Sequence, residues 1–280
     1  MSNFSKVISN IMDSIIEISK GLVIGYIILA IGMYVFQRSL LYHPAKEMGA
    51  PKNYGMYETE LVKLTTQDNN ETHAWFTKPQ GKKPIMVYLH GNAGNLADRA
   101  QKLKTFLKNT NGYGQMAVSW RGYGGSQGDP TEEGLYNDAR AAIKYLIDNG
   151  YKADNIFMYG ESLGTGVVIQ MATEYDMKAI ILEAPYTSVA ARAAELYPYM
   201  PTGLMLKDKL VSIDKIKSVK VPVLIFHGYL DKVMPIHHGR MMLEAANEPK
   251  EARFFENVAH TDFNFDEISQ ITYEFIDKID

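Results

Sequence analysis

Residues 157–168, FMYGESLGTGVV, combine a serine with closely spaced glycines in a pattern that could support nucleophilic catalysis. The stretch Gly160-Glu161-Ser162-Leu163-Gly164 matches G-x-S-x-G, in which the serine stands on a sharp turn between a strand and a helix. Glycine two positions before and two after the serine lets this turn close without side-chain clashes. The pattern therefore predicts that the Ser162 hydroxyl attacks a carbonyl carbon, with the positive N-terminal end of the next helix near the developing oxyanion.

The same glycines do not fit a phosphate-binding loop. A P-loop that starts at Gly160 would need glycine in place of Thr165, followed by lysine. A dinucleotide fingerprint that starts at Gly164 would need glycine in place of Ile169. The other glycine-rich stretch, HGNAG at residues 90–94, fits neither pattern. We therefore expect no nucleotide and no other cofactor.

Asp231 and His260 follow Ser162 along the chain, each just past the carboxyl end of a predicted strand. Open α/β sheets place their sites at that edge. Because serine is a weak nucleophile at neutral pH, a histidine must accept its proton and an acid must hold the imidazole in the right tautomer. We expect His260 and Asp231 to play these roles and Ser162, Asp231 and His260 to form a catalytic triad.

Other acids and histidines are weaker candidates for these roles. Two histidines end predicted strands immediately before glycine and are expected to shape loops, and two open a predicted helix. Two aspartates lie in a segment inserted between strands. These residues are His90, His227, His237, His238, Asp208 and Asp214. Glu161, inside the turn, is expected to form a structural ion pair or to face the loops.

The tetrahedral intermediate needs hydrogen-bond donors for its oxyanion. One is the backbone N–H of Leu163, directly after the nucleophile, and the other should come from the loop after strand 85–90. In that loop we favour the N–H of Asn92, with Ala93 as the alternative. The Asn92 side chain would then only hold the loop.

The elements that must position these groups alternate between apolar strands and amphipathic helices. This alternation predicts one mostly parallel sheet covered by helices on both faces, an α/β fold, opened by an antiparallel pair. Helices are expected over 95–109, from an N-cap at Asp129 with Pro130 as the first helical residue, over 163–174 and over 261–279. The strands are expected at residues 57–64, 72–78, 85–90, 114–120, 155–160, 178–185, 221–228 and 252–256.

The N-terminal segment, residues 1–45, differs from the rest. Residues 21–36 carry no charge, and Lys20 and Arg38 bracket them. This run predicts a single membrane-anchor helix at about 21–36, extended by apolar neighbours toward the ~20 residues that usually span a bilayer. The alternatives are a helix packed on the domain and a cleaved signal peptide. Basic residues lie on both sides, so the orientation in the membrane cannot be read. The catalytic domain is expected over 46–280.

Composition excludes several functional classes. The formal charge is −3, so no basic field indicates nucleic-acid binding. The chain has no cysteine, which excludes disulfides and thiolate chemistry. The histidines do not show H-E-x-x-H or a similar spacing, so we expect no metal site. Nothing in the composition indicates an oligomeric state.

The motifs YLHGNAGN, WRGYGGSQG, YGESLGTG, HGYLD and VAH resemble those of the α/β-hydrolase superfamily. More narrowly, the chain looks like a membrane-anchored branch with one N-terminal helix, whose members include protein-depalmitoylating thioesterases and lysophospholipid hydrolases. The resemblance covers about residues 38–280 and implies that Ser162, Asp231 and His260 carry catalysis. It also implies a lipid, small-molecule or acyl-protein substrate. Some relatives are anchored through palmitoylated cysteines, which this chain lacks.

A short cap is expected over about 186–216, between the sixth and seventh strands. Tyr197, Met200 and Met205 could line an acyl pocket there, and Tyr199, Leu204 and Leu206 are further candidates. The alternative is that these side chains pack the cap on the core. The predicted function is a serine hydrolase of carboxylic esters or thioesters that works through an acyl-enzyme. A prolyl-peptidase-like serine peptidase and a non-catalytic, membrane-tethered binding protein remain as alternatives.

Overall fold

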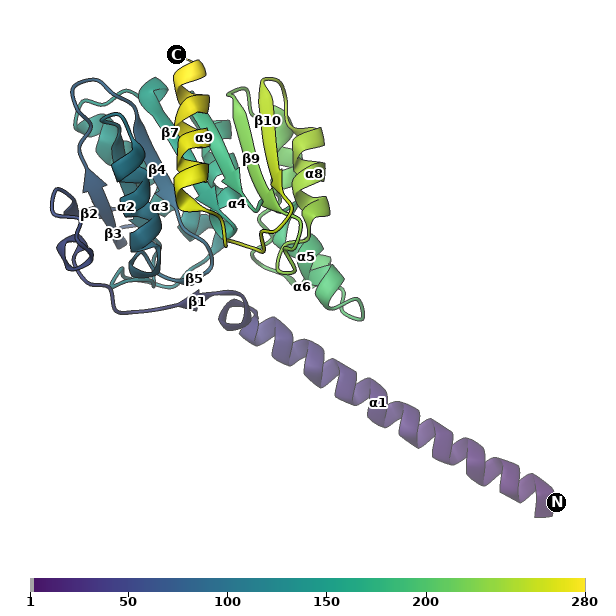
Figure 1. Cartoon of the computed structure of the whole chain (residues 1–280). Helices are drawn as coiled ribbons and strands as arrows, with labels where there is room; N and C mark the ends of the chain where they lie inside the picture. Colours follow the sequence, from purple (N-terminus) through teal and green to yellow (C-terminus); the bar gives the residue numbers. More distant parts are fainter. Residues whose placement is uncertain (1–2, 280) are drawn as a thin grey trace.

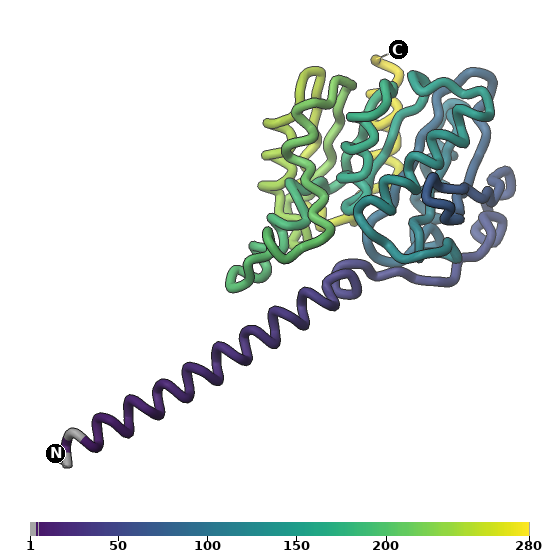
Figure 2. The backbone as a smooth tube through the Cα atoms, turned by 180° about the vertical axis from the view of Figure 1, so that it is seen from behind, coloured from purple at the N-terminus to yellow at the C-terminus, as the bar shows by residue number. Residues whose placement is uncertain are grey.

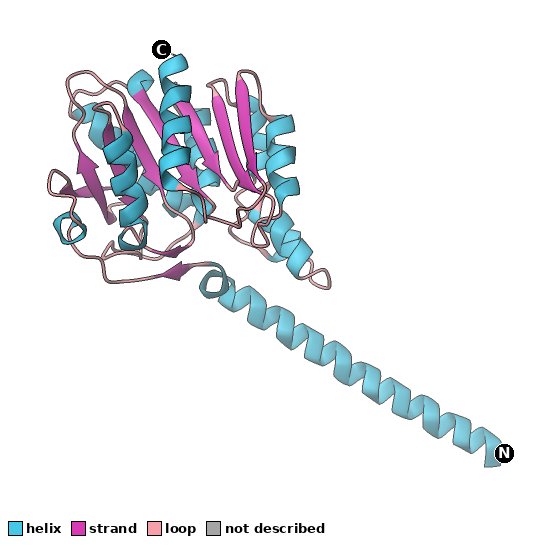
Figure 3. Cartoon of the chain, in the orientation of Figure 1, coloured by secondary structure: helices cyan, strands magenta, loops and turns pink. Residues whose placement is uncertain are grey.

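A computed structural model describes residues 3–279 of the chain, and its centre is an eight-stranded, mostly parallel sheet (Figures 1 and 3). The strand order is β10-β9-β8-β7-β4-β6-β3-β2. β2 and β3 pair antiparallel, β3 also runs antiparallel to β6, and the other neighbours are parallel. The strands are β2 (Glu60–Thr65), β3 (Glu71–Thr77), β4 (Ile85–Leu89), β6 (Gly114–Ser119), β7 (Ile156–Glu161), β8 (Ala179–Glu183), β9 (Val223–Gly228) and β10 (Lys250–Phe255). The predicted α/β fold and its antiparallel opening pair are confirmed.

Helices cover both faces of the sheet. The two helices α2 (Ala100–Asn109) and α9 (Phe265–Lys278) pack together on one face. On the other face lie α3 (Glu132–Asp148), α4 (Leu163–Glu174) and α8 (Ile236–Ala245). Short 3-10 turns complete the chain at Pro51–Tyr54, Ala97–Arg99, Ala153–Asn155 and Ile216–Ser218. Because β7 is buried on both faces, the turn between β7 and α4 is held by core packing on each side.

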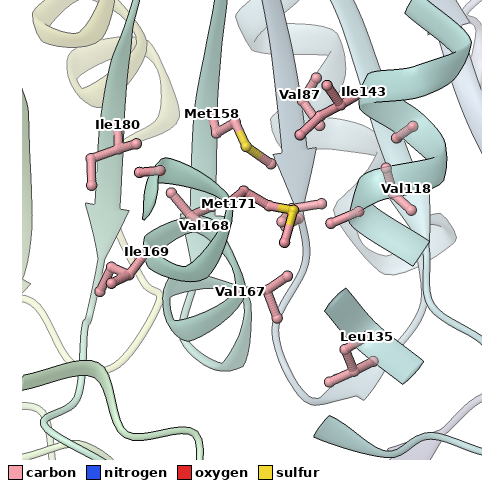
Figure 4. Close-up of a cluster of buried hydrophobic side chains, with 14 of the residues drawn as sticks. Val87, Val118, Leu135, Ile143, Met158, Val167, Val168, Ile169, Met171 and Ile180 are labelled. Carbon is pink, nitrogen blue, oxygen red and sulfur yellow. The ribbon is translucent and has the colours of Figure 1, made fainter. Parts of the chain in front are cut away.

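The core beneath this turn is made of closely packed aliphatic and methionine side chains. Val167, Val168 and Met171 of α4 lie against Met158 of β7 and the neighbouring strands, as Figure 4 shows. All four side chains are completely buried. Dense packing of this kind leaves few voids and resists local displacement, so the segment that carries Ser162 stands on a rigid base.

Three helix starts differ from the sequence prediction, and among the strands the start of the first differs most. α2 begins at Ala100, five residues after the start expected at position 95, because a 3-10 turn occupies Ala97–Arg99. α3 begins after an N-cap at Thr131, whose side chain accepts a hydrogen bond from the Gly134 N–H, so the predicted N-cap at Asp129 is wrong. α9 begins after Asn264, four residues later than the start expected at position 261, because the Asn264 side chain caps it. The first strand begins at Glu60, since Tyr57 lies in an exposed turn.

The N-terminal helix α1 (Asn3–Leu41) is 39 residues long, well beyond the predicted 21–36. No proline interrupts the segment, and the helix ends shortly before Pro44, where the ring disfavours helical backbone. α1 projects from the domain in Figures 1 and 2. Its stretch Lys6–Leu41 is long and apolar enough to cross a membrane, and the most apolar window of that stretch is not buried by the rest of the chain.

After α1 the chain runs along the same edge of the sheet as the loops of the site. The two-residue strand β1 (His43–Pro44) pairs with β5 (Ala93–Gly94) in the loop after β4. Between β8 and β9 lies the cap, with α5 (Val189–Leu196), α6 (Thr202–Met205) and α7 (Ser212–Lys215). Figure 1 shows α5 and α6 reaching toward α1. The site is therefore bordered by the sheet edge, the cap and the end of α1.

Candidate active site

Ser162 stands on a strained turn between β7 and α4. Its backbone angles are φ 49° and ψ −112°, a region that residues with a side chain rarely adopt. The turn closes only because both flanking positions are glycine. A Cβ on Gly160 would lie 2.7 Å from the Thr165 backbone, and one on Gly164 would lie 2.2 Å from the Leu89 carbonyl oxygen. This geometry matches the turn predicted for a nucleophilic serine.

The structure brings Ser162, His260 and Asp231 into one hydrogen-bonded line. The distance from Ser162 Oγ to His260 Nε2 is 2.8 Å, and that from His260 Nδ1 to Asp231 Oδ2 is 2.7 Å. The three residues come from the turn after β7, the loop after β9 and the loop after β10. In the sheet β10 lies beside β9, and only β8 separates β9 from β7. Residues up to 98 positions apart in the chain therefore meet at one edge of the sheet.

The Asp231 carboxylate is buried and held from several sides. Its Oδ1 accepts the Met234 N–H at 2.7 Å, and His227 Nε2 lies 3.5 Å from its Oδ2. Burial by itself would raise the pKa of the Asp231 carboxyl, but hydrogen bonds from His227 and His260 outweigh it and hold the pKa below its usual value. Asp231 is therefore an anion that can orient and stabilise a protonated His260.

The loop after β4 lies beside Ser162. Asn92 and Leu163, the two residues predicted to offer oxyanion N–H groups, both border the cavity that contains Ser162. The Asn92 side chain donates to the Leu41 carbonyl at the end of α1, and its Oδ1 accepts the Tyr123 hydroxyl at 3.2 Å. The side chain thus holds the loop, as predicted, and it also ties the loop to α1.

A buried charge cluster supports the loop and the turn from below. Glu161 Oε2 accepts Lys102 Nζ at 3.0 Å, and the same lysine donates to Glu183 at the end of β8. Burial would raise the pKa of the Glu161 carboxyl, but the charges of Lys102 and Arg99 outweigh it and keep the pKa low. Glu161 is an ion-pair partner, in line with the prediction. Nothing in the sequence pattern pointed to Lys102, which occupies a helix position where lysine is usually exposed.

A mainly apolar cavity of about 250 Å³ opens next to Ser162. Three cap residues proposed from sequence, Tyr197, Met200 and Met205, line it together with Leu206. Tyr199 and Leu204 do not line it and are exposed instead. The opposite wall is the C-terminal end of α1, which includes the end of the run predicted as a membrane anchor and the residues just after it. The wall residues of α1 are Met33, Tyr34, Gln37, Leu40 and Leu41.

Two histidines that the sequence left scattered come together with an acid near the cap. His237 Nε2 lies 2.9 Å from Glu195 Oε1, and His238 Nε2 lies 3.2 Å from the same oxygen. The Thr187 N–H points to His238 Nδ1 at 3.3 Å, which makes that nitrogen an acceptor and leaves Nε2 to donate to Glu195. The ligand atoms of these three side chains lie within 4.8 Å of one another at the junction of α5 and α8, a spacing that could hold a metal ion and that the sequence pattern did not indicate.

Comparisons with known proteins agree with this architecture. Residues 80–212 match a family described as serine aminopeptidase, S33. The uncharacterized protein Rv2307c of Mycobacterium tuberculosis is 33% identical over 84% of this chain and 85% of its own length. The human α/β-hydrolase domain-containing protein 17B is 33% identical over 72% of this chain and 69% of its own length.

Solved structures share the fold. The esterase Pf2001 of Pyrococcus furiosus superposes with a TM-score of 0.70 at 21% identity, over 85% of this chain and 97% of the esterase. At that identity the likeness concerns the fold and not the substrate. Together with the sequence similarity to protein 17B, the strand order and the turn at Ser162, it leads to one conclusion: this chain belongs to the α/β-hydrolase superfamily.

Proposed function

We propose that this α/β-hydrolase is a serine hydrolase that cleaves carboxylic esters or thioesters with apolar acyl groups, working at a membrane through its N-terminal helix. The observation that carries the proposal is the line of hydrogen bonds from Ser162 through His260 to Asp231, 2.8 and 2.7 Å long, beside an apolar cavity. Those groups supply the nucleophile, the base and the orienting acid of acyl transfer.

The proposed first half-reaction forms an acyl-enzyme. His260 Nε2 takes the hydroxyl proton as Ser162 Oγ attacks the carbonyl carbon, and Asp231 stabilises the resulting imidazolium. The N–H groups of Leu163 and Asn92 donate to the oxyanion of the tetrahedral intermediate. When the intermediate collapses, His260 returns the proton to the departing alcohol or thiol, and the acyl group stays on Ser162.

The second half-reaction repeats these steps with water. His260 removes a proton from the water as its oxygen attacks the acyl carbon, and the collapse returns that proton to Ser162 Oγ and releases the carboxylic acid. Each proton that leaves an oxygen, of Ser162 or of water, is thus carried by a single imidazole to the leaving alcohol or thiol or back to Ser162. Neither half-reaction uses a cofactor.

The apolar lining of the cavity and the long apolar helix support a substrate with a lipid-like acyl chain. A peptidase is the second candidate, since the matching family is described as a serine aminopeptidase. The cavity argues for acyl groups, because its walls are mostly Met, Leu, Tyr and Val side chains with few polar groups to receive a peptide.

The test is labelling of the detergent-solubilised protein by a fluorophosphonate probe, which bonds to an activated serine. Wild type and the exposed control Ser218→Ala should label, and Ser162→Ala should not. Turnover of a nitrophenyl ester, a nitrophenyl thioester and a prolyl nitroanilide, which release nitrophenol, nitrothiophenol and nitroaniline, then ranks the candidates. If folded wild type does not label, the non-catalytic alternative replaces this proposal. If the peptide is the best substrate, the peptidase does.

A further inference from the structure

The cap is hydrogen-bonded to α1 at several points along the C-terminal half of that helix. Tyr26 donates its hydroxyl hydrogen to the Tyr199 carbonyl at 2.8 Å, near the tip of the cap. Nearer the domain, Gln37 accepts the Lys207 N–H at 2.7 Å and donates to the Met205 carbonyl at 3.3 Å. These contacts make α1 and the cap one structural unit.

An ion pair also joins the last turn of α1 to the cap. Arg38 Nε lies 2.8 Å from Asp208 Oδ2, and Arg38 Nη2 lies 3.2 Å from Oδ1, a two-pronged contact with a buried carboxylate. Tyr26 and Arg38 are twelve residues apart, which is about 18 Å along a helix. The cap therefore follows the uncharged part of α1 over a distance comparable with half the ~30 Å hydrocarbon core of a bilayer.

The cavity reaches the outer surface between these two elements. Leu40 of α1 and Leu196 and Tyr197 of the cap all line the cavity, yet their exposed fractions are 59, 53 and 40%. Beyond this mouth the cap tip carries Leu204, which is 87% exposed, and Tyr199. The helix beside the tip, which Tyr26 joins to Tyr199, also exposes large apolar side chains such as Val35 and Phe36, and exposed apolar surface of this extent marks a membrane or protein interaction site.

From these observations we infer that the last two turns of α1 are a wall of the acyl-binding site, and that the cap tip enters the bilayer so that acyl chains pass from the lipid phase to Ser162. The inference rests on the proposed function. It goes beyond that function in giving the membrane anchor a part in substrate selection. The cavity mouth would receive the acyl chain of a bilayer-resident ester or thioester, since the mouth is apolar and lies beside the helix that would sit in the membrane.

The first experiment narrows the mouth. The full chain in phosphatidylcholine nanodiscs is assayed with hexadecanoyl and butanoyl nitrophenyl esters. In Leu40→Trp, the ratio of kcat/KM for the long ester to that for the short one should fall by about 10-fold or more, because a filled pocket rejects added methylenes. Val35→Trp, on exposed helix surface outside the cavity, is the matched control and should keep the wild-type ratio within about twofold.

Leu196→Trp fills the mouth from the cap side and should reproduce the effect, which keeps the test intact if Leu40→Trp does not fold. Fluorophosphonate labelling reports whether each variant retains an active serine. An unchanged chain-length ratio in both labelled variants overturns the inference. A wild type that neither labels nor hydrolyses any ester overturns the proposed function instead.

The second experiment measures depth in the membrane and does not require turnover. Because the chain has no cysteine, Leu204→Cys provides a single position for an environment-sensitive fluorophore. Lipids brominated on their acyl chains should quench this label in vesicles. A label on Tyr57→Cys, an 84% exposed position in a turn before β2, should not be quenched. Equal, weak quenching at both positions would show that the tip stays in water and would overturn entry from the bilayer.

Discussion

Arg99 and Glu161 join the loop after β4 to β7, the strand that ends just before Ser162. Arg99 Nη2 lies 2.9 Å from Glu161 Oε1, and Arg99 Nε lies 3.1 Å from the same oxygen. The guanidinium also donates to the Ala93 carbonyl at 2.5 Å, while Glu161 Oε1 accepts the Gly91 N–H at 3.3 Å. One partly buried ion pair therefore sets the position of a loop expected to supply an oxyanion donor.

Arg99→Met should lower kcat for ester hydrolysis by about 10-fold or more and change KM little. The reason is that a less firmly held loop weakens the hydrogen bond from its N–H group to the oxyanion, and this hydrogen bond is strongest in the transition state. Arg99→Lys keeps the positive charge but lacks the forked guanidinium group, and it should retain more of the wild-type kcat than Arg99→Met. Steady-state kinetics check this, with circular dichroism to establish folding. A rise in KM at constant kcat would contradict the positioning role.

Asp231→Asn should lower kcat by roughly 10³- to 10⁴-fold, because an amide can present an N–H to His260 and favour the wrong tautomer. The exposed neighbour Asp262→Asn serves as the control and should retain activity. Single-turnover acylation measured by stopped flow separates this chemical effect from binding. A loss smaller than about tenfold would mean that another acid orients His260.

Gly164→Ala should destabilise the fold by about 3 kcal/mol or more, because its Cβ would lie 2.2 Å from backbone that cannot move freely. Gly203→Ala has nothing within 4 Å and is the matched control. Urea titration in detergent micelles gives the difference in the free energy of unfolding. Equal midpoints for the two variants would argue against a tightly closed turn at Ser162.

His90 links stability to pH. Burial, helped by the charge of Arg99, lowers the pKa of the His90 imidazole from 6.5 to about 3. Between these values the unfolded chain binds a proton that the folded chain excludes. Above pH 6.5, His90 therefore does not lower the free energy of unfolding. Below that value the free energy of unfolding falls by up to about 1.4 kcal/mol per pH unit until the pH approaches 3.

His90→Asn should remove that part of the pH dependence. Urea unfolding of wild type at pH 7 and pH 5 should differ by about 2 kcal/mol more than unfolding of the variant does. The exposed His43→Asn should keep the wild-type difference. The same pH difference in wild type and His90→Asn would exclude His90 as its source.

Much of the fold could be predicted because the strands are short apolar runs between glycine or proline and polar turns. Residues 85–90 and 221–228 are of this kind and lie within one or two residues of β4 and β9. Element ends were less predictable. Asp129 and Pro130 form a good start signal, but Thr131 caps α3, since the local pattern leaves more than one capping residue open.

The sequence by itself predicted that Ser162, Asp231 and His260 come together, because parallel strands end at one edge and each residue lies within five positions of the end of such a strand. Tertiary structure alone decided what surrounds them. Lys102 and Glu161 carry charges that usually lie at the surface, and only the packed sheet makes them a buried pair. Met33 lies in the run predicted to be a membrane anchor and Leu40 just beyond it, because hydropathy records how apolar a residue is and not what it contacts. Only the folded chain brings the end of α1 against a cap some 160 positions later and makes it a wall of the cavity.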